Sequence, residues 1–260
     1  MMITKTFKRY ENKFQLNESQ FEQLLPILLT EMVPDSYTSK NDSYSIYNIY
    51  FDTENYDIIR HSLSKPYYKE KLRLRSYAIP ISSDDKVFLE LKKKIGGIVS
   101  KRRATMTLNE ANRFISKREY PLETNAINRL VLEEIDNFLD HHIIEPKAYI
   151  SYERSAYLGK NDPEFRVTFD YNIKSRQNNL SLEKGDFGNQ LLPKDGYIME
   201  IKILGAIPVW LTHVLSSLKI YSSSFSKYGN AYTEYRRQSL AKIINMPISD
   251  NTELKYCIGN

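Results

Sequence analysis

Residues 69–77, with the sequence KEKLRLRSY, alternate between cationic and apolar side chains. Successive side chains of a β-strand point to opposite faces of the sheet. As a strand, this segment carries a row of polar side chains on one face, namely Lys69, Lys71, Arg73, Arg75 and Tyr77. The other face carries Leu72 and Leu74, which are typical of a buried hydrophobic layer. The cationic row must therefore face either water or an enclosed polar space.

The same alternation recurs along the chain. Further strands are predicted at residues 7–16, 44–52, 86–94, 98–107, 147–158, 164–173 and 197–204. Seven of the eight predicted strands carry an Arg or Lys on the polar face. Isolated charges on strands are common, but a repeated row of this kind is not. The charged members of these faces include Arg9, Glu11, Lys13, Glu90, Lys92, Lys101, Arg103, Arg154, Arg166, Asp170, Glu200 and Lys202.

Helices are predicted between the strands, at residues 17–28, 53–60, 109–117, 123–139, 208–218 and 225–244. An open sheet with one solvated face would explain the charges, but the helices also need a surface to pack against. We therefore predict an α+β fold: an eight-stranded antiparallel β-barrel, with its charged face lining the bore and helices packed outside. A single domain at residues 1–245 and a tail at 246–260 is the simplest organisation.

The composition narrows the class of protein. The net charge of +5 and the pI near 9.0 suit an anionic partner. The only cysteine, Cys257, excludes an intrachain disulfide and a cysteine-based metal site. No apolar run approaches the roughly 20 residues that span a bilayer, and the N-terminal stretch lacks the apolar core of a signal peptide. We therefore expect a cytoplasmic protein.

A bore lined by many cations requires a multivalent anion, because buried like charges without a partner are costly. Arginine is suited to bidentate phosphate contacts and lysine to neutralisation of a point charge. A chain of phosphates fits this lining best. The carboxylates among the cations, Glu11, Glu90 and Glu200, are then interpreted as hard oxygen ligands for Mg²⁺ or Mn²⁺ that bridges phosphates.

Eight segments resemble, in order, the VTC domain. They are RYENKF (9–14), NIYFDT (48–53), YKEKLRLRSY (68–77), FLELKKK (88–94), ISYERSAY (150–157), RVTFD (166–170), MEIK (199–202) and FSKYG (225–229). The VTC domain is the catalytic polyphosphate polymerase domain of the vacuolar transporter chaperone complex and its bacterial relatives. It belongs to the triphosphate tunnel metalloenzyme, or CYTH-like, superfamily. The resemblance covers about residues 7–236.

The resemblance implies an eight-stranded tunnel that transfers the γ-phosphate of ATP onto inorganic polyphosphate with the help of Mn²⁺ or Mg²⁺. We expect the residues that act directly on the phosphates to be Lys13, Arg73, Arg75, Lys92, Arg154, Arg166 and Lys227. Further substrate-binding residues are expected to be Arg9, Lys101, Arg103, Tyr152, Lys202 and Ser226. The resemblance assigns the metal to Glu200, and Glu11 and Glu90 join it from the pattern of charges. The run Lys101-Arg102-Arg103 leaves the register of its match open by a residue or two.

One departure from the superfamily bears on the reaction. Its hydrolytic members begin with Glu-x-Glu-x-Lys, whereas this chain has Arg9-x-Glu11-x-Lys13. Exchanging a carboxylate for a cation weakens a metal site and strengthens phosphate binding, which favours transfer to another phosphate over hydrolysis.

Two alternatives stay open within the same fold: a metal-dependent triphosphatase, acting on inorganic triphosphate or a nucleoside triphosphate, and a non-catalytic polyphosphate-binding sensor. Binding of nucleic acid is not expected, because it would leave the carboxylates on these strands unexplained. A separate membrane channel subunit is compatible with the resemblance and would place the protein at the inner face of a membrane.

Overall fold

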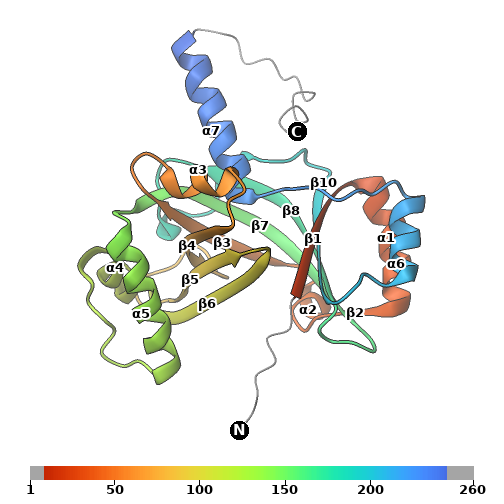
Figure 1. Ribbon diagram of the computed structural model, residues 1–260, viewed down its shortest axis with the longest axis horizontal. Coiled ribbons are helices and arrows are strands. Elements are labelled where there is room, and N and C mark those ends of the chain that lie inside the picture. Colours follow the sequence, from red (N-terminus) through yellow and green to blue (C-terminus); the bar gives the residue numbers. More distant parts are fainter. Residues whose placement is uncertain (1–8, 245–260) are drawn as a thin grey trace.

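The computed structural model describes residues 9–244, and one large antiparallel sheet forms its centre (Figure 1). Within this range the long strands lie in the order β1-β10-β8-β7-β3-β4-β5-β6, while β2 pairs with β7 and β9 with β8. The strands are β1 (Arg9–Asn17), β2 (Met32–Pro34), β3 (Tyr44–Asp52), β4 (Tyr68–Ser76), β5 (Lys86–Ile95), β6 (Ile98–Thr107), β7 (Glu145–Gly159), β8 (Arg166–Arg176), β9 (Asn189–Gln190) and β10 (Gly196–Leu204).

The helices are close to the predicted segments. They are α1 (Glu18–Glu31), α2 (Thr38–Asn41), α3 (Asp57–Leu63), α4 (Leu108–Lys117), α5 (Ala126–His141), α6 (Val209–Ser217) and α7 (Lys227–Ile244), with a 3₁₀ turn at Leu182–Lys184. The short elements β2, α2 and β9 were not predicted. The predicted tail, residues 246–260, and the first two residues of the predicted strand 7–16 lie outside the described residues.

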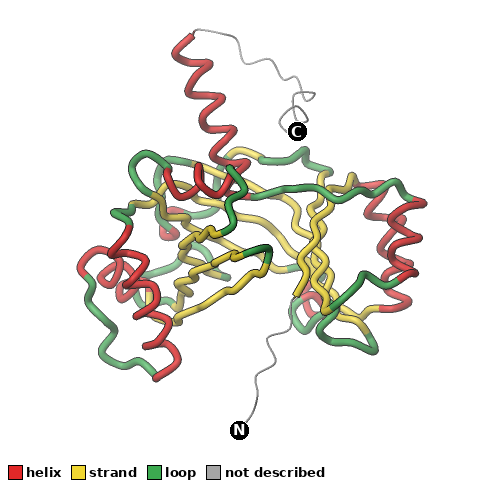
Figure 2. The backbone as a smooth tube through the Cα atoms, viewed as in Figure 1, coloured by secondary structure: helices red, strands yellow, loops and turns green. Residues whose placement is uncertain are grey.

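The helices α1, α4, α5 and α6 lie against the outer face of the sheet, as predicted (Figure 2). Two hydrophobic clusters hold them there. One lies under α4 and α5 and includes Leu72 and Leu89, which are fully buried. The other lies under α1 and α6 and includes Val167 and Phe169. Because side chains alternate along each strand, burial of these residues directs the charged set to the opposite, inner face.

The predicted closure of the barrel is not confirmed. Among residues 9–244, β1 and β6 end the strand order, and no backbone ladder joins them. Side chains connect the two sides instead, since Lys92 Nζ on β5 lies 3.3 Å from Glu11 Oε1 on β1. The sheet is therefore strongly curled but open along this seam.

Local sequence signals explain several boundaries. Asn17, the predicted N-cap of the first helix, accepts a hydrogen bond from Gln20 N, and the Gln20 side chain accepts one from Asn17 N. Thr107 and Glu110 form the same capping box at the start of α4. The predicted hairpin turn joins β5 to β6 at Gly96, whose positive φ of 53° favours glycine.

The start of α7 covers one end of the inner face, near α3 (Figure 1). Phe225 and Tyr228 pack against apolar side chains of the inner face, such as Ile150 and Ile198. The buried Asp52 at the end of β3 accepts hydrogen bonds from Tyr228 Oη and from the backbone of α3. This carboxylate therefore fixes α3 and α7 against the same strand.

Candidate functional site

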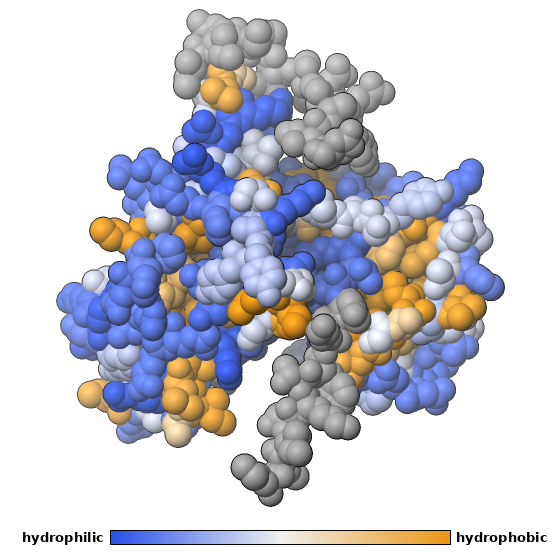
Figure 3. All heavy atoms as spheres, in the orientation of Figure 1, coloured by the Kyte–Doolittle hydropathy of each residue, from blue (hydrophilic) through white to orange (hydrophobic). Residues whose placement is uncertain are grey.

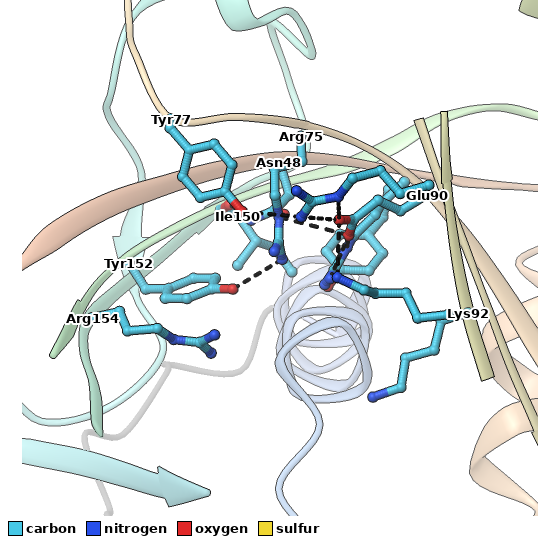
Figure 4. A network of polar contacts seen from close by, with 12 residues as sticks. Asn48, Arg75, Tyr77, Glu90, Lys92, Ile150, Tyr152 and Arg154 are labelled. Carbon is cyan, nitrogen blue, oxygen red and sulfur yellow. Dashed lines mark hydrogen bonds and ion pairs between the residues drawn. The ribbon is translucent and has the colours of Figure 1, made fainter. Parts of the chain in front are cut away.

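Glu90 on β5 is the centre of the first group of charges on the inner face, and it has no exposed surface (Figure 4). Its Oε2 accepts a hydrogen bond from Arg73 Nε at 2.8 Å and forms an ion pair with Arg73 Nη2 at 2.7 Å. Its Oε1 accepts one from Arg103 Nε at 2.6 Å and lies 3.4 Å from Lys101 Nζ. Burial alone would raise the pKa of Glu90, but Arg73, Arg75 and the other cations hold it far below its usual range.

Arg75 connects this group to the neighbouring strands. Its Nε donates to Asn48 Oδ1 at 3.0 Å and its Nη2 to Tyr152 Oη at 3.2 Å (Figure 4). Asn48 in turn donates to the backbone oxygen of Ile150. Burial would raise the pKa of Tyr152, but Arg75, Arg154 and Lys227 lower it to about 8. The buried guanidinium of Arg75 is thus held in one orientation.

Asp170 on β8 is the centre of the second group. It accepts two hydrogen bonds from Arg154, at 2.6 and 2.8 Å, and contacts Lys227 Nζ from α7. The ammonium of Lys227 also lies 4.3 Å from the centre of the Tyr152 ring. Burial would raise the pKa of Asp170, but Arg154 and Lys227 lower it to about 2. This carboxylate therefore remains charged and orients two cations.

The third group alternates in charge across β1 and β10. Glu11 lies opposite Lys202 in the register, and Lys13 lies opposite Glu200. Lys13 Nζ lies 3.8 Å from Glu11 Oε1 and 4.0 Å from Glu200 Oε2, and Lys202 Nζ lies 2.7 Å from Glu200 Oε1. Burial would lower the pKa of Lys13, but Glu200 and Glu11 raise it. The two carboxylates thus share the neighbourhood of one ammonium.

The predicted metal ligands differ in their surroundings. Within residues 9–244, no three side chains of Asp, Glu, His or Cys gather closely enough to hold a metal. Glu11 and Glu200 fit a divalent ion that takes one or two carboxylates and completes its shell with phosphate oxygens. Glu90 fits less well, because arginines already donate to both of its oxygens.

Lys71 belongs to the site and was missing from the predicted set, although alternation along β4 placed it beside Arg73. Its Nζ lies 3.4 Å from Ser226 Oγ, the hydroxyl that accepts a hydrogen bond from Gly229 N in the first turn of α7. Burial, with repulsion from Lys69 and Lys13, lowers the pKa of Lys71 to about 7. Asp170 was predicted on the charged face but not among the substrate-binding or metal-binding residues, because its role depends on a contact with α7 that strand patterns do not reveal.

The remaining predicted residues lie towards the edges of the site. Arg166 Nη2 contacts Asp35 Oδ2 at 3.0 Å and Tyr44 Oη at 3.3 Å, away from the Glu90 group. Arg102 points outward, with its Nε 3.5 Å from Glu134, whereas Lys101 and Arg103 face inward and contact Glu90. Arg9 was predicted to bind substrate, but its side chain lies outside the described ones, which begin at Glu11.

The inner face of this curled antiparallel sheet carries charges that suit a multivalent anion, and the space-filling view shows hydrophilic residues in the central recess (Figure 3). The family model of the VTC domain matches residues 8–235. The chain therefore belongs to the VTC domain family. This is a family of enzymes that bind polyphosphate or triphosphate.

The chain is also similar to solved structures of low sequence identity. A Bacillus halodurans protein provisionally described as an adenylate cyclase is 14% identical, with a TM-score of 0.50, over 84% of this chain and 95% of its own. The PH1819 protein of Pyrococcus horikoshii is also 14% identical, with a TM-score of 0.41, over 87% of this chain and 100% of its own.

A comparison with curated proteins finds no match. Within residues 9–244, none of the helices has the length and apolar character that crossing a membrane requires.

Proposed function

We propose that this chain is a polyphosphate polymerase, which transfers the γ-phosphate of ATP onto a growing inorganic polyphosphate chain on the inner face. The observation that carries the proposal is the excess of cations over carboxylates there. The inner cations are Lys13, Lys71, Arg73, Arg75, Lys92, Lys101, Arg103, Arg154, Lys202 and Lys227, and the carboxylates that contact them are Glu11, Glu90, Asp170 and Glu200. A chain of phosphates supplies the missing negative charge along a line.

Three arginines are preorganised for binding phosphate. Arg73, Arg75 and Arg154 are each held by a hydrogen bond to a neighbouring side chain, so little conformational entropy is lost when an anion binds. A guanidinium has five N–H donors, and Arg154 uses two of them on Asp170. The remaining donors are available to phosphate oxygens, with Lys227 beside them.

Phosphoryl transfer requires mainly positioning and neutralisation of charge. The bond between the γ-phosphorus and the β,γ-bridging oxygen breaks, and ADP leaves with the electron pair. The terminal oxygen of the acceptor phosphate forms the new bond to the same phosphorus. Because this oxygen is already ionised, no general base is needed, and the cations of the inner face suffice to hold both partners.

The divalent ion and the closed tunnel are part of the proposal. Glu200 and Glu11 would hold Mn²⁺ or Mg²⁺, which when bound neutralises charge on phosphate oxygens. A phosphate chain would also attract Lys92 on β5 and Lys13 on β1 towards a common anion. We expect this attraction to draw the two sides of the seam together and complete the tunnel.

A metal-dependent triphosphatase is the second candidate. Glu11 and Glu200 favour it, because these two carboxylates both lie near Lys13 and, as a pair, would suit an ion that activates water. Glu200→Gln tests the site in either case: we expect loss of ADP formation, with part of the nucleotide affinity retained. Normal turnover by Glu200→Gln would contradict the metal assignment, and binding without turnover by the wild-type protein would favour the sensor.

A further inference from the structure

Four aromatic side chains form a continuous row at one end of the inner face: Tyr37 before α2, Tyr44 on β3, Tyr77 after β4, and Phe88 on β5. The ring centres lie 5.5 Å apart for Tyr37 and Tyr44, 6.4 Å for Tyr44 and Tyr77, and 5.5 Å for Tyr77 and Phe88. We call this row the aromatic rim. It joins segments that are distant in the sequence at a single edge of the site.

The aromatic rim is continuous with the cation site. Arg103 Nη2 donates to Tyr77 Oη at 3.0 Å, and the Arg103 guanidinium lies 4.5 Å from the centre of the Phe88 ring. On the other side, Tyr44 Oη accepts a hydrogen bond from Arg166 Nη2 at 3.3 Å. A ligand that touches the rim is therefore within reach of groups that bind phosphate.

The rim and α7 lie at opposite ends of the same strand. Lys71, near the start of β4, contacts Ser226 at the beginning of α7, whereas Tyr77 follows the last residue of β4. Tyr77 follows Lys71 by six residue steps along the strand, which corresponds to about 20 Å. The site therefore has two chemically different ends, one closed by α7 and one edged with aromatic rings.

A phosphate chain has no flat apolar face, so the rim has no evident task in binding polyphosphate. Yet two of its members are open to solvent, since Tyr37 is 66% exposed and Tyr77 is 43% exposed. Exposed aromatic rings beside cations are the usual platform for a nucleobase, whose own ring stacks on them. The flat, partly apolar component of a nucleoside triphosphate is its base.

We propose that the aromatic rim binds the nucleobase of the donor nucleotide, so that the triphosphate runs along the inner face towards Lys71 and α7. This inference rests on the proposed function, in which a nucleoside triphosphate is the donor. Stacking discriminates weakly among bases, because every base has a π face. The rim thus sets the direction of the nucleotide and recognises the flat ring of the base more than its substituents.

The test compares ATP with inorganic tripolyphosphate, measured by titration calorimetry. We expect Tyr37→Ala to weaken ATP binding about tenfold and to leave tripolyphosphate binding unchanged, and Tyr37→Phe to restore ATP affinity. Tyr67→Ala is the matched control, because Tyr67 is 77% exposed and lies just before the opposite end of β4. Tyr37 is exposed, so its replacement is expected to leave the thermal midpoint unchanged.

Three outcomes would overturn the inference: unchanged ATP affinity in Tyr37→Ala and in Tyr77→Leu, an equal loss of tripolyphosphate affinity, or an effect of Tyr67→Ala on ATP in place of Tyr37→Ala. Failure of the proposed function looks different. In that case the wild-type protein would bind tripolyphosphate but form no polyphosphate from ATP, whatever the effect of Tyr37→Ala on ATP binding.

Discussion

Arg154 donates two hydrogen bonds to Asp170, from Nε to Oδ1 at 2.6 Å and from Nη2 to Oδ2 at 2.8 Å. The same carboxylate contacts Lys227, which is the first residue of α7. Asp170 therefore connects the curled sheet to the helix that covers one end of it. It also sets the orientation of two cations that we propose to bind phosphate.

Asp170→Asn should weaken both the fold and the site. Removing one partner of a buried ion pair costs about 3–5 kcal/mol, because the remaining charges are left uncompensated. We expect the free energy of unfolding to fall by this amount and tripolyphosphate affinity to fall as well, as measured by urea denaturation and calorimetry. Asp84→Asn, in the exposed turn before β5, is the control. Equal stability of the two variants would contradict the role of Asp170.

Glu90 and Glu200 should respond differently to loss of charge. Glu90→Gln removes the group that balances Arg73 and Arg103, so we expect a loss of about 3–5 kcal/mol in unfolding free energy without added metal. Glu200→Gln should instead lose affinity for Mn²⁺ in the presence of tripolyphosphate. Metal titration and thermal unfolding of both variants separate the roles. A loss of Mn²⁺ affinity in Glu90→Gln alone would reverse the assignment.

Arg103 and Arg102 are adjacent in the sequence but lie on opposite faces of β6, so they form a matched pair. Arg103 donates to Glu90 and Tyr77, whereas Arg102 is exposed near Glu134. We expect Arg103→Gln to weaken tripolyphosphate binding about tenfold and Arg102→Gln to leave it unchanged. A greater loss of tripolyphosphate affinity in Arg102→Gln than in Arg103→Gln would contradict this orientation of β6.

The lowered pKa of Lys71 predicts how phosphate binding depends on pH. Its pKa is lowered to about 7, so the ammonium is protonated below this value and loses its charge above it. Because a phosphate anion stabilises the protonated form, affinity should fall as the pH rises through 7, by about tenfold between pH 6 and 8.5.

The ligand also titrates in this range, so the informative quantity is the difference between wild type and Lys71→Met. We expect the Lys71 contribution to disappear in Lys71→Met and to become independent of pH in Lys71→Arg. An identical pH profile for all three proteins would rule out Lys71 as a phosphate ligand.

Side-chain alternation was enough to predict which residues share the inner face. Arg73, Arg75 and Arg154 lie where the pattern placed them, because the period of a strand is independent of the rest of the fold. The same rule explains why Arg102 is excluded. The helix caps at Asn17 and Thr107 are local in the same sense.

Features that depend on distant segments were not predictable in this way. Whether β1 and β6 pair is decided by the twist accumulated over the whole sheet, and the predicted closed barrel is not confirmed. The balance of charge around Glu90, and the contact of Asp170 with Lys227, arise only when separate elements meet. A pattern within one strand carries no information about these contacts.

The most direct test of the proposed function is to incubate the purified protein with ATP and Mn²⁺ and to resolve the products. Polyphosphate is detected on a gel, ADP by chromatography, and orthophosphate by a colorimetric assay, with Glu200→Gln as the inactive control. We predict long polyphosphate chains and an equivalent amount of ADP, with little orthophosphate. Orthophosphate without chains would contradict the polymerase and establish the triphosphatase.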